Sequence, residues 1–447
     1  MHAAEMAQSA LIWGFDPKIV ATAIVVICYI ILFTEKLNRA VVALLGAVVM
    51  IFAGILTQET ALKGIDFNTL ALLIGMMTIV GISEKSGMFQ FVAVWGAKKV
   101  KANPRGLMIV LAAVTAVFSA FLDNVTTVLL IAPVTFQITR KLKINPYPYL
   151  ILEIFSSNIG GTSTLIGDPP NILIGSALNL SFMDFVKELA PIVAVTMVVL
   201  IFCFDLIWSK SLVTTDKNRQ AVMKINEKDT ITDWKLLGKS LFVLFLVIAG
   251  FVSAEHLHIA NGTIAICGAA VLLLLYTLGS SHEERERKVE EVFAVVDWTT
   301  IFFFSGLFVI VYGLEETGVL RMLGQMFIDI TDGSIKKSVF LIVWISAILS
   351  SAIDNIPFVA TMIPMIKSME ESMGGREAMM PVWWALSLGA CFGGNGTLIG
   401  ASANVIVAGM AQREGHPIHF MKFLIWSIPT MLISVGIATI YLYIQYF

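Results

Sequence analysis

Long apolar runs separated by short polar segments make up most of the chain. A helix needs about 20 predominantly apolar residues to cross the hydrocarbon core of a bilayer. We therefore predict ten crossings, two of which have a polar break near the centre. They are residues 18–34, 39–56, 67–84, 146–178 (broken), 188–208, 239–256, 260–279, 298–315, 381–411 (broken) and 420–444. This pattern predicts an all-α polytopic membrane protein.

Two further apolar stretches, residues 106–140 and 335–367, are interrupted by polar residues at their centres. The central pairs are Asp123 with Asn124 and Asp354 with Asn355. An aspartate at the centre of a bilayer costs about 2.5–3.5 kcal/mol on insertion scales. Each stretch is also too long for a single helix with a charge at its middle. We predict that each folds as a re-entrant helical hairpin, which enters and leaves the membrane on the same side.

Lysine and arginine are distributed unevenly over the loops. Of the 30 basic residues, 22 fall in loops that the predicted spans assign to one side. Those loops are residues 35–39, 85–143, 209–239, 280–297 and 412–422. Such an excess marks the cytoplasmic side, so both termini are predicted to face outside. Within these loops, residues 88–101 are predicted to form an amphipathic helix along the cytoplasmic interface.

The two broken crossings carry residues that interrupt a helix. The first contains SSNIGGTSTLIGDPPN, residues 156–171, and the second contains GGNGTLIGASAN, residues 393–404. Backbone N–H and C=O groups cannot stay unpaired in lipid, so a break at membrane depth has to line a polar cavity or be buried in protein. Paired breaks in corresponding parts of a transporter indicate a substrate or ion site.

The chain repeats itself three times in the same order. DFNTLALLIGMMTIVGISEKSG (66–87) is similar to DWTTIFFFSGLFVIVYGLEETG (297–318), the two hairpin centres correspond, and so do the two breaks. We predict repeat 1 at residues 18–208, a cytoplasmic linker at 209–238 and repeat 2 at 239–447. Each repeat has five crossings, an odd number, so the two repeats are expected to lie in opposite orientations. That inverted arrangement is common among secondary transporters.

Composition supports a membrane protein and adds few candidates for chemistry. The 447 residues are 57% hydrophobic and 14% charged, and their net charge is −2. Mean hydropathy is +0.85. This balance suggests no nucleic-acid partner. The four cysteines lie in apolar stretches without metal-ligand spacing, so no metal site is expected. No nucleophile–base pair stands out among the spans, which argues against an enzyme, and no cofactor is expected beyond a coupling ion, H⁺ or Na⁺.

Four buried acids are candidate proton carriers: Asp123, Asp354, Asp168 and Glu153. Ionisable residues inside a membrane usually belong to ion pathways or proton relays. The alternative for Asp123 and Asp354 is that they only cap the helices that follow the hairpin tips. The same alternative holds for Asp168, which precedes two prolines that can restart a helix.

At these residues the sequence resembles a known family. FLDNVTTVLLIAPVT together with NIGGTSTLIGDPPNILIG is similar to the arsenite permease/NhaD ion-transporter superfamily, in particular its melanosomal P protein-like subgroup. The similarity runs from about residue 20 to the C-terminus. The resemblance implies an elevator-type homodimer. In it, spans 1–3 and 6–8 form the scaffold, and the hairpins and broken helices move.

The resemblance also implies that the hairpin tips and the breaks together bind the substrate and any coupling ion. With the polar residues of the breaks, the candidate residues are Asp123, Asn124, Val125, Thr126, Ser157, Asn158, Gly160, Gly161, Thr162, Ser163, Thr164, Asp168, Asn171, Asp354, Asn355, Ile356, Gly393, Gly394, Asn395, Gly396, Thr397 and Asn404. Dicarboxylate transporters of this kind carry Ser-Asn-Thr at both tips, whereas this chain has Asp-Asn-Val and Asp-Asn-Ile. The difference argues against sodium-coupled dicarboxylate uptake.

The substrate is expected to be a small inorganic ion or metalloid. No Lys or Arg is expected at the site, so the acids favour protons, cations or a neutral hydroxylated species such as arsenous acid. Proton-coupled efflux of arsenite or antimonite is the leading hypothesis. Sodium–proton antiport and the transport of another anion are alternatives within the same class, and a passive ion channel is the alternative outside it. The chain has no nucleotide-binding loop of the GxxxxGK type, so ATP could drive transport only through a separate ATPase subunit. The expected location is a bacterial plasma (inner) membrane, with lipid as the surrounding partner.

Overall fold

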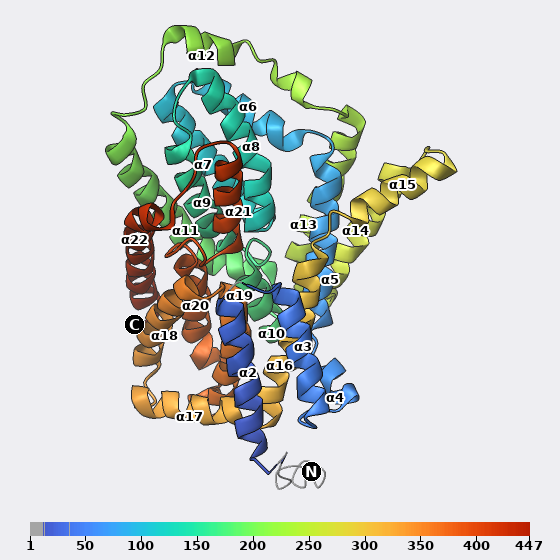
Figure 1. Ribbon diagram of the computed structural model, residues 1–447, viewed down its shortest axis with the longest axis vertical. Coiled ribbons are helices and arrows are strands. Elements are labelled where there is room, and N and C mark those ends of the chain that lie inside the picture. Colours follow the sequence, from blue (N-terminus) through green and yellow to red (C-terminus); the bar gives the residue numbers. More distant parts are fainter. Residues whose placement is uncertain (1–11, 13, 35) are drawn as a thin grey trace.

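The computed structural model describes residues 12, 14–34 and 36–447, and the regular elements of that part are helices (Figure 1). Seven of these helices are long and apolar enough to cross a membrane. They are α5 (Phe67–Glu84), α7 (Pro104–Phe121), α11 (Phe182–Trp208), α13 (Trp234–Leu257), α16 (Trp298–Glu316), α18 (Ile335–Ala352) and α22 (Phe420–Tyr446). Three shorter apolar helices are α2 (Pro17–Phe33), α3 (Arg39–Phe52) and α14 (Asn261–Thr277). The chain is therefore an all-α polytopic membrane protein, as predicted.

Both predicted hairpins are present. Helix α7 turns back as α8 (Asn124–Leu142), and α18 turns back as α19 (Asn355–Met369). Figure 1 shows α7 and α8 reaching the middle of the molecule from its upper end, while α18 lies in the lower half and α19 rises toward the middle. The two hairpins thus enter from opposite ends, which is the relation expected of inverted repeats.

Both predicted breaks are also present. Helix α9 (Tyr147–Gly161) stops before α10 (Pro169–Leu178), and α20 (Gly375–Gly393) stops before α21 (Ser402–Arg413). The two segments between these half-helices contain only turns and bends. The order of elements from α5 to α11 is repeated from α16 to α22, so each half of the chain builds the same series of shapes.

Short helices lie at the two ends of the bundle. Helix α6 (Met88–Lys99) precedes the first hairpin, and α17 (Val319–Thr331) precedes the second. Only α6 was expected from the sequence; α17 is its counterpart in the second half. Figure 1 shows α12 (Asp216–Met223) and α6 at the upper end, α15 (His282–Phe293) projecting to the right in the upper half, and α4 (Gln58–Lys63) and α17 toward the lower end. The upper helices belong to the lysine- and arginine-rich segments.

The linker between the two halves is folded onto the first half. Its 3-10 helix η1 (Glu227–Thr230) packs against α6, where the Lys98 ammonium pairs with the Glu227 carboxylate. The hydrogen bond that the Lys98 ammonium donates to this carboxylate lowers the pKa of Glu227. Asn218 of α12 donates a hydrogen bond of 3.1 Å from Nδ2 to the Leu142 carbonyl at the end of α8.

The helices pack mainly within two groups. The scaffold group contains α2, α3, α5, α13, α14 and α16, in which α3 packs on α16 and α5 packs on α14. The central group contains the hairpins and broken helices with α11 and α22, in which α7 packs on α9 and α18 packs on α20. Because corresponding helices of the two halves pair in the same way, the inverted relation extends to the packing.

Candidate substrate- and ion-binding site

Buried asparagines from both halves meet where the two breaks face each other. Asn158 Nδ2 donates hydrogen bonds of 2.9 Å to Oδ1 of Asn395 and of Asn404. Asn124 Nδ2 donates to Asn158 Oδ1 at 3.2 Å. All four side chains are buried. The first hairpin and the two broken helices are therefore joined by one amide network.

Two further contacts explain how the breaks keep their shape. Asn171 Nδ2 donates hydrogen bonds of 2.9 Å to the Thr162 and Thr164 carbonyls. Its counterpart in the second half, Asn404, donates to the Gly394 and Thr397 carbonyls at 2.8 and 2.9 Å. A broken helix frees carbonyl groups that lipid cannot satisfy. Each break supplies one asparagine amide for them.

The hydroxyls of the first break are used by the backbone. Ser157, Thr162 and Ser163 donate to carbonyls three or four residues earlier in their own segment, and Thr164 donates to the Ala120 carbonyl of the first hairpin. In the second break, Thr397 Oγ1 donates to the Ser351 carbonyl at 2.6 Å. These candidate residues shape the site, and they do not line its cavity.

Asp168 occupies the N-cap position of α10, but it does not cap that helix. Its Oδ1 atom accepts hydrogen bonds from Nδ2 of Asn124 at 3.5 Å and of Asn355 at 3.4 Å. Its side chain is 0% exposed, and Oδ2 has no hydrogen-bond partner among the described residues. The alternative that Asp168 serves only as a cap is therefore wrong. Its carboxylate joins the tips of both hairpins.

Asp123 and Asp354 do cap the helices after the hairpin tips. Asp123 Oδ1 accepts from the Thr126 backbone N at 2.8 Å, and Oδ2 accepts from the Thr126 hydroxyl. Asp354 Oδ1 accepts from the Ile356 backbone N at 3.2 Å. The helix N-termini at the tips, which attract anions when they are free, are thus occupied by carboxylates of the chain itself.

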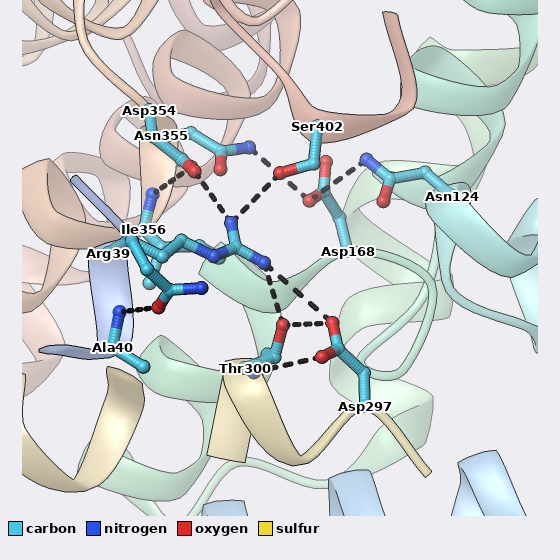
Figure 2. Close-up of polar contacts among 11 residues, drawn as sticks. Arg39, Ala40, Asn124, Asp168, Asp297, Thr300, Asp354, Asn355, Ile356 and Ser402 are labelled. Carbon is cyan, nitrogen blue, oxygen red and sulfur yellow. Dashed lines mark hydrogen bonds and ion pairs between the residues drawn. The ribbon is translucent and has the colours of Figure 1, made fainter. Parts of the chain in front are cut away.

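The expectation that no basic residue lies at the site is wrong. Arg39 Nη1 lies 3.2 Å from Asp354 Oδ2 and donates to Ser402 Oγ at 3.0 Å (Figure 2). Its Nη2 atom donates to Thr300 Oγ1 at 2.7 Å and lies 3.8 Å from Asp297 Oδ2. The guanidinium is also 5.4 Å from the centre of the Phe303 ring.

A cavity of about 460 Å³ lies between the two groups. On one side it follows α5 along Leu73, Met77, Gly81 and Glu84, and on the other it follows α8 from Asn124 to Leu130. Both helices run from the middle of the molecule toward its upper end in Figure 1. The cavity thus extends from the hairpin tips toward the side that the lysine and arginine bias predicts to be cytoplasmic. The other site residues lining it are Arg39, Asp123, Asp168, Asp297, Thr300, Asn355, Ile356 and Ser402.

Glu153 is buried but stands apart from this cavity. Its Oε1 atom accepts a hydrogen bond of 2.5 Å from Thr135 Oγ1, and Oε2 has no partner among the described residues. Glu153 does not line the cavity. The structure does not bring this proton-carrier candidate together with the three aspartates.

Sequence reasoning missed Arg39, Asp297 and Thr300 as site residues. Arg39 begins an apolar helix, so it resembled one of the basic residues that commonly flank a span. Asp297 directly precedes a predicted span, where an N-cap residue is common, and its side chain does accept a hydrogen bond from the Thr300 N at 3.1 Å. The repeat was the one signal that could have linked Asp297 with Thr300. Their counterparts in the first half, Asp66 and Thr69, form the same hydrogen bonds.

The sequence of the chain matches a known protein family. The profile of the CitMHS citrate transporter family matches residues 29–389. The chain belongs to this family. The resemblance to the arsenite permease/NhaD superfamily is thereby confirmed. As a member of the CitMHS family, the chain is a membrane transporter and not an enzyme.

Relatives in other organisms match over nearly the whole chain. An "Uncharacterized transporter" of Mycobacterium tuberculosis is 41% identical over 434 residues, which cover 96% of this chain and 99% of that protein. The "46 kDa membrane protein" of Mycobacterium leprae is 38% identical, with 96% and 99% covered. The human P protein is 32% identical over 508 residues, with 96% of this chain but 60% of the P protein covered. The expected likeness to the P protein is confirmed.

A solved structure has the same fold. The YdaH transporter of Alcanivorax borkumensis superimposes with a TM-score of 0.56, covering 86% of this chain and 87% of YdaH. Sequence identity is 12%, so this likeness concerns the fold alone.

Proposed function

We propose that the protein is a secondary active transporter that exchanges a small inorganic solute for protons, with efflux of arsenite or antimonite as its leading activity. The observation that carries the proposal is the imbalance of charge around the cavity. Among the described residues, Glu84, Asp123, Asp168 and Asp297 line it with a single basic residue, Arg39. That residue is shared between Asp297 and Asp354, an acid that does not itself line the cavity.

The excess of carboxyl groups around the cavity determines which solutes it can bind. Inside a protein, several neighbouring carboxylates cannot all stay ionised unless cations neutralise their charge. Without cations, some of them take up protons. Asp168 is the most constrained of them, because it is wholly buried and its two hydrogen-bond donors are uncharged amides. Such an acid can carry a proton. The buried asparagine amides beside it can hydrogen-bond a neutral hydroxylated solute such as arsenous acid.

Sodium–proton antiport is the second candidate. It is favoured by the oxygen-rich surroundings of Asp168, because hard cations bind carboxylate, amide and carbonyl oxygens. An anion permease is less well supported. A free tricarboxylate such as citrate would meet several carboxyl groups and one guanidinium, and the helix N-termini at the tips are capped by Asp123 and Asp354. A passive channel is the remaining alternative, and a separate ATPase subunit would replace the proton gradient as the energy source.

Transport by an elevator motion of the central group is part of the proposal. It is supported by the packing of the helices into two groups and by the cavity that opens between those groups on one side. We propose in addition a homodimer formed through the scaffold group, in a bacterial plasma membrane with both termini outside. The location of the lysine- and arginine-rich segments at one end of the bundle supports that orientation.

The test is arsenite accumulation in everted membrane vesicles, with and without an acid-inside gradient. Efflux from the cell becomes uptake into such vesicles, driven by protons that leave. In Asp168→Asn the remaining oxygen can still accept a hydrogen bond from Asn124 or Asn355, but the side chain can no longer take up a proton. We expect normal expression and loss of gradient-driven accumulation, and the same result in Asp123→Asn.

Glu153→Gln is the matched control, since it neutralises a buried acid of the same group outside the cavity. We expect it to keep at least half of the wild-type accumulation ratio. Gradient-driven accumulation by Asp168→Asn at the wild-type ratio would contradict the proposal. If the wild type accumulates ²²Na⁺ and not arsenite, the second candidate replaces the first. Arsenite entry that never exceeds equilibrium would indicate the channel.

A further inference from the structure

Arg39 divides its contacts equally between the two groups of helices. Asp297 and Thr300, on α16, belong to the scaffold group, as does Arg39 itself on α3. Asp354 is the N-cap residue of α19 and Ser402 begins α21, and both belong to the central group. In Figure 2 the guanidinium lies between these two pairs of side chains. One positive charge therefore serves one carboxylate on each side of the boundary.

The contacts of Arg39 cross the boundary between the two groups, so they change if the groups move past each other. The scaffold pair of Arg39 with Asp297 stays together during such a motion, whereas the pair of Arg39 with Asp354 has to separate. The side chains of Arg39 and Asp354 are 28% and 26% exposed, so both are largely withdrawn from water. Breaking a largely buried pair by removing one partner leaves an uncompensated charge, which is strongly unfavourable. Asp354 then needs another counter-charge.

We propose that Arg39 and a proton alternate as the partner of Asp354, and that this exchange couples solute movement to the proton gradient. The inference rests on the transport cycle proposed above and adds the residue that enforces its coupling. In the conformation of Figure 2, the Asp354 carboxylate is paired with Arg39. When the central group leaves the scaffold, the Asp354 carboxylate takes up a proton. On return, the guanidinium displaces that proton into the cavity.

Among the ion pairs of the described residues, Asp354 has Arg39 as its one basic partner. The charged and titratable side chains at this place are Arg39 on α3, Asp297 on α16, Asp123 and Asp168 at the starts of α8 and α10, and the Tyr29 hydroxyl, which contacts Pro357 O and Thr361 on α19. The nearby acids add negative charge, which makes an unpaired Asp354 carboxylate still less favourable. Arg39 is thus the single charged group that can release the proton.

The two halves differ at this point. Helix α3 begins with Arg39, and its counterpart α14 begins with Asn261. The corresponding hairpin-tip residue in the first half, Asp123, accordingly has Thr126 as its side-chain partner and forms no ion pair with the described residues. The exchange of partners therefore takes place at one hairpin tip and not at the other. As a result the two conformations differ in how many protons they bind, and coupling requires such a difference.

The test compares two fluxes of arsenite in everted vesicles: accumulation driven by an acid-inside gradient, and exchange of arsenite across the membrane at equal pH. In Arg39→Gln and in Asp354→Asn we expect accumulation to fall at least tenfold while exchange keeps at least a third of its wild-type rate. The double variant should resemble Asp354→Asn alone, and Arg39→Lys should regain part of the accumulation. Arg105→Gln is the matched control, because Arg105 pairs with Asp205 on α11 within the central group. We expect it to accumulate arsenite normally.

A second measurement does not depend on the solute. Met77 lines the cavity. The variant Met77→Cys, in a background without the four native cysteines, reports whether the cavity is open to a membrane-impermeant thiol reagent. Because the thiolate is the reactive species, the labelling rate of any accessible cysteine falls as the pH is lowered. We therefore compare the two backgrounds, and we expect the fall from mildly alkaline to mildly acidic buffer to be at least twofold larger with Asp354 present than in Asp354→Asn. Gradient-driven accumulation in Arg39→Gln at the wild-type level, or equal loss of both fluxes in the two single variants, would overturn the inference. If the wild type does not accumulate arsenite, the proposed solute is wrong, and the labelling result alone then decides the inference.

Discussion

At the scale of single residues, the two breaks depend on two asparagines. Asn171 and Asn404 each bind two carbonyls that the interrupted helices cannot satisfy. Their Oδ1 atoms differ in role, because that of Asn171 accepts from Ser387 Oγ at 2.6 Å and that of Asn404 accepts from Asn158. The first asparagine therefore supports a break, whereas the second also joins the two halves at the site.

Replacing either asparagine should destabilise the fold. Asn171→Ala and Asn404→Ala each leave two buried carbonyls unpartnered, and a buried polar group without its partner costs about 1–3 kcal/mol. We expect both variants to unfold at a lower temperature in detergent, by an amount corresponding to that range. Gln412→Ala is the control, because Gln412 is an exposed amide on α21. Unfolding of Asn404→Ala at the wild-type temperature would show that the carbonyls find other donors.

At the scale of elements, the central group depends on close approach of helices. A Cβ atom on Gly160 would lie 2.3 Å from Ala116 O, where α9 crosses α7. A Cβ atom on Gly393 would lie 2.6 Å from Ala347 O, where α20 crosses α18. The two glycines correspond in the repeat. The first arm of each hairpin therefore packs on its broken helix through a glycine at the start of the break.

Gly160→Ala should push α7 away from α9. Backbone atoms cannot move aside as a flexible side chain can, and overpacking typically costs about 1–3 kcal/mol. We expect a lower yield of folded protein and a lower unfolding temperature. Gly436→Ala is the matched control, since Gly436 lies within α22 and a Cβ there would meet no atom within 4 Å. That variant should be as stable as the wild type or slightly more stable. Equal stability of the two variants would contradict the argument.

At the scale of the whole molecule, few polar contacts join the scaffold group to the central group. Besides Arg39, Asn68 Nδ2 of α5 donates to Ser176 Oγ of α10 at 2.8 Å. The Tyr29 hydroxyl of α2 donates to the Pro357 carbonyl of α19 at 2.9 Å. An elevator motion has to break each of these contacts, so a covalent link at one of them should hold the protein in this conformation.

The pair Asn68→Cys with Ser176→Cys tests this motion. In a background without native cysteines, we expect mercury to bridge the two thiols and to stop arsenite flux. An excess of a small thiol, which displaces the mercury and is washed out before arsenite is added, should restore the flux. Each single-cysteine variant should keep its flux in mercury, which controls for simple binding of the metal. Undiminished flux in a fully bridged protein would exclude a sliding motion at this boundary.

Much of the element map could be predicted from the sequence. Helices α5, α7 and α16 begin and end within two residues of the predicted boundaries, and both breaks lie where glycines and prolines interrupt apolar runs. These features are local, because span length and backbone satisfaction are decided by neighbouring residues. Helix α17 was missed although its counterpart α6, which is no longer than α17, was predicted; extending the repeat beyond residue 318 would have indicated it.

The sequence by itself determined the membrane character, the two hairpins, the two breaks and their pairing through the repeat. Which side chains share the site was decided by the tertiary structure. Arg39 and Asp354 are far apart along the chain, and only the packing of α3 against α16 and of α16 against α19 brings them together. The same holds for Asp168, whose position suggested a cap and whose carboxylate instead meets both hairpin tips. Hydrophobic patterning fixes where a helix lies in the membrane, but the direction and partner of a polar side chain depend on which helices fold against it.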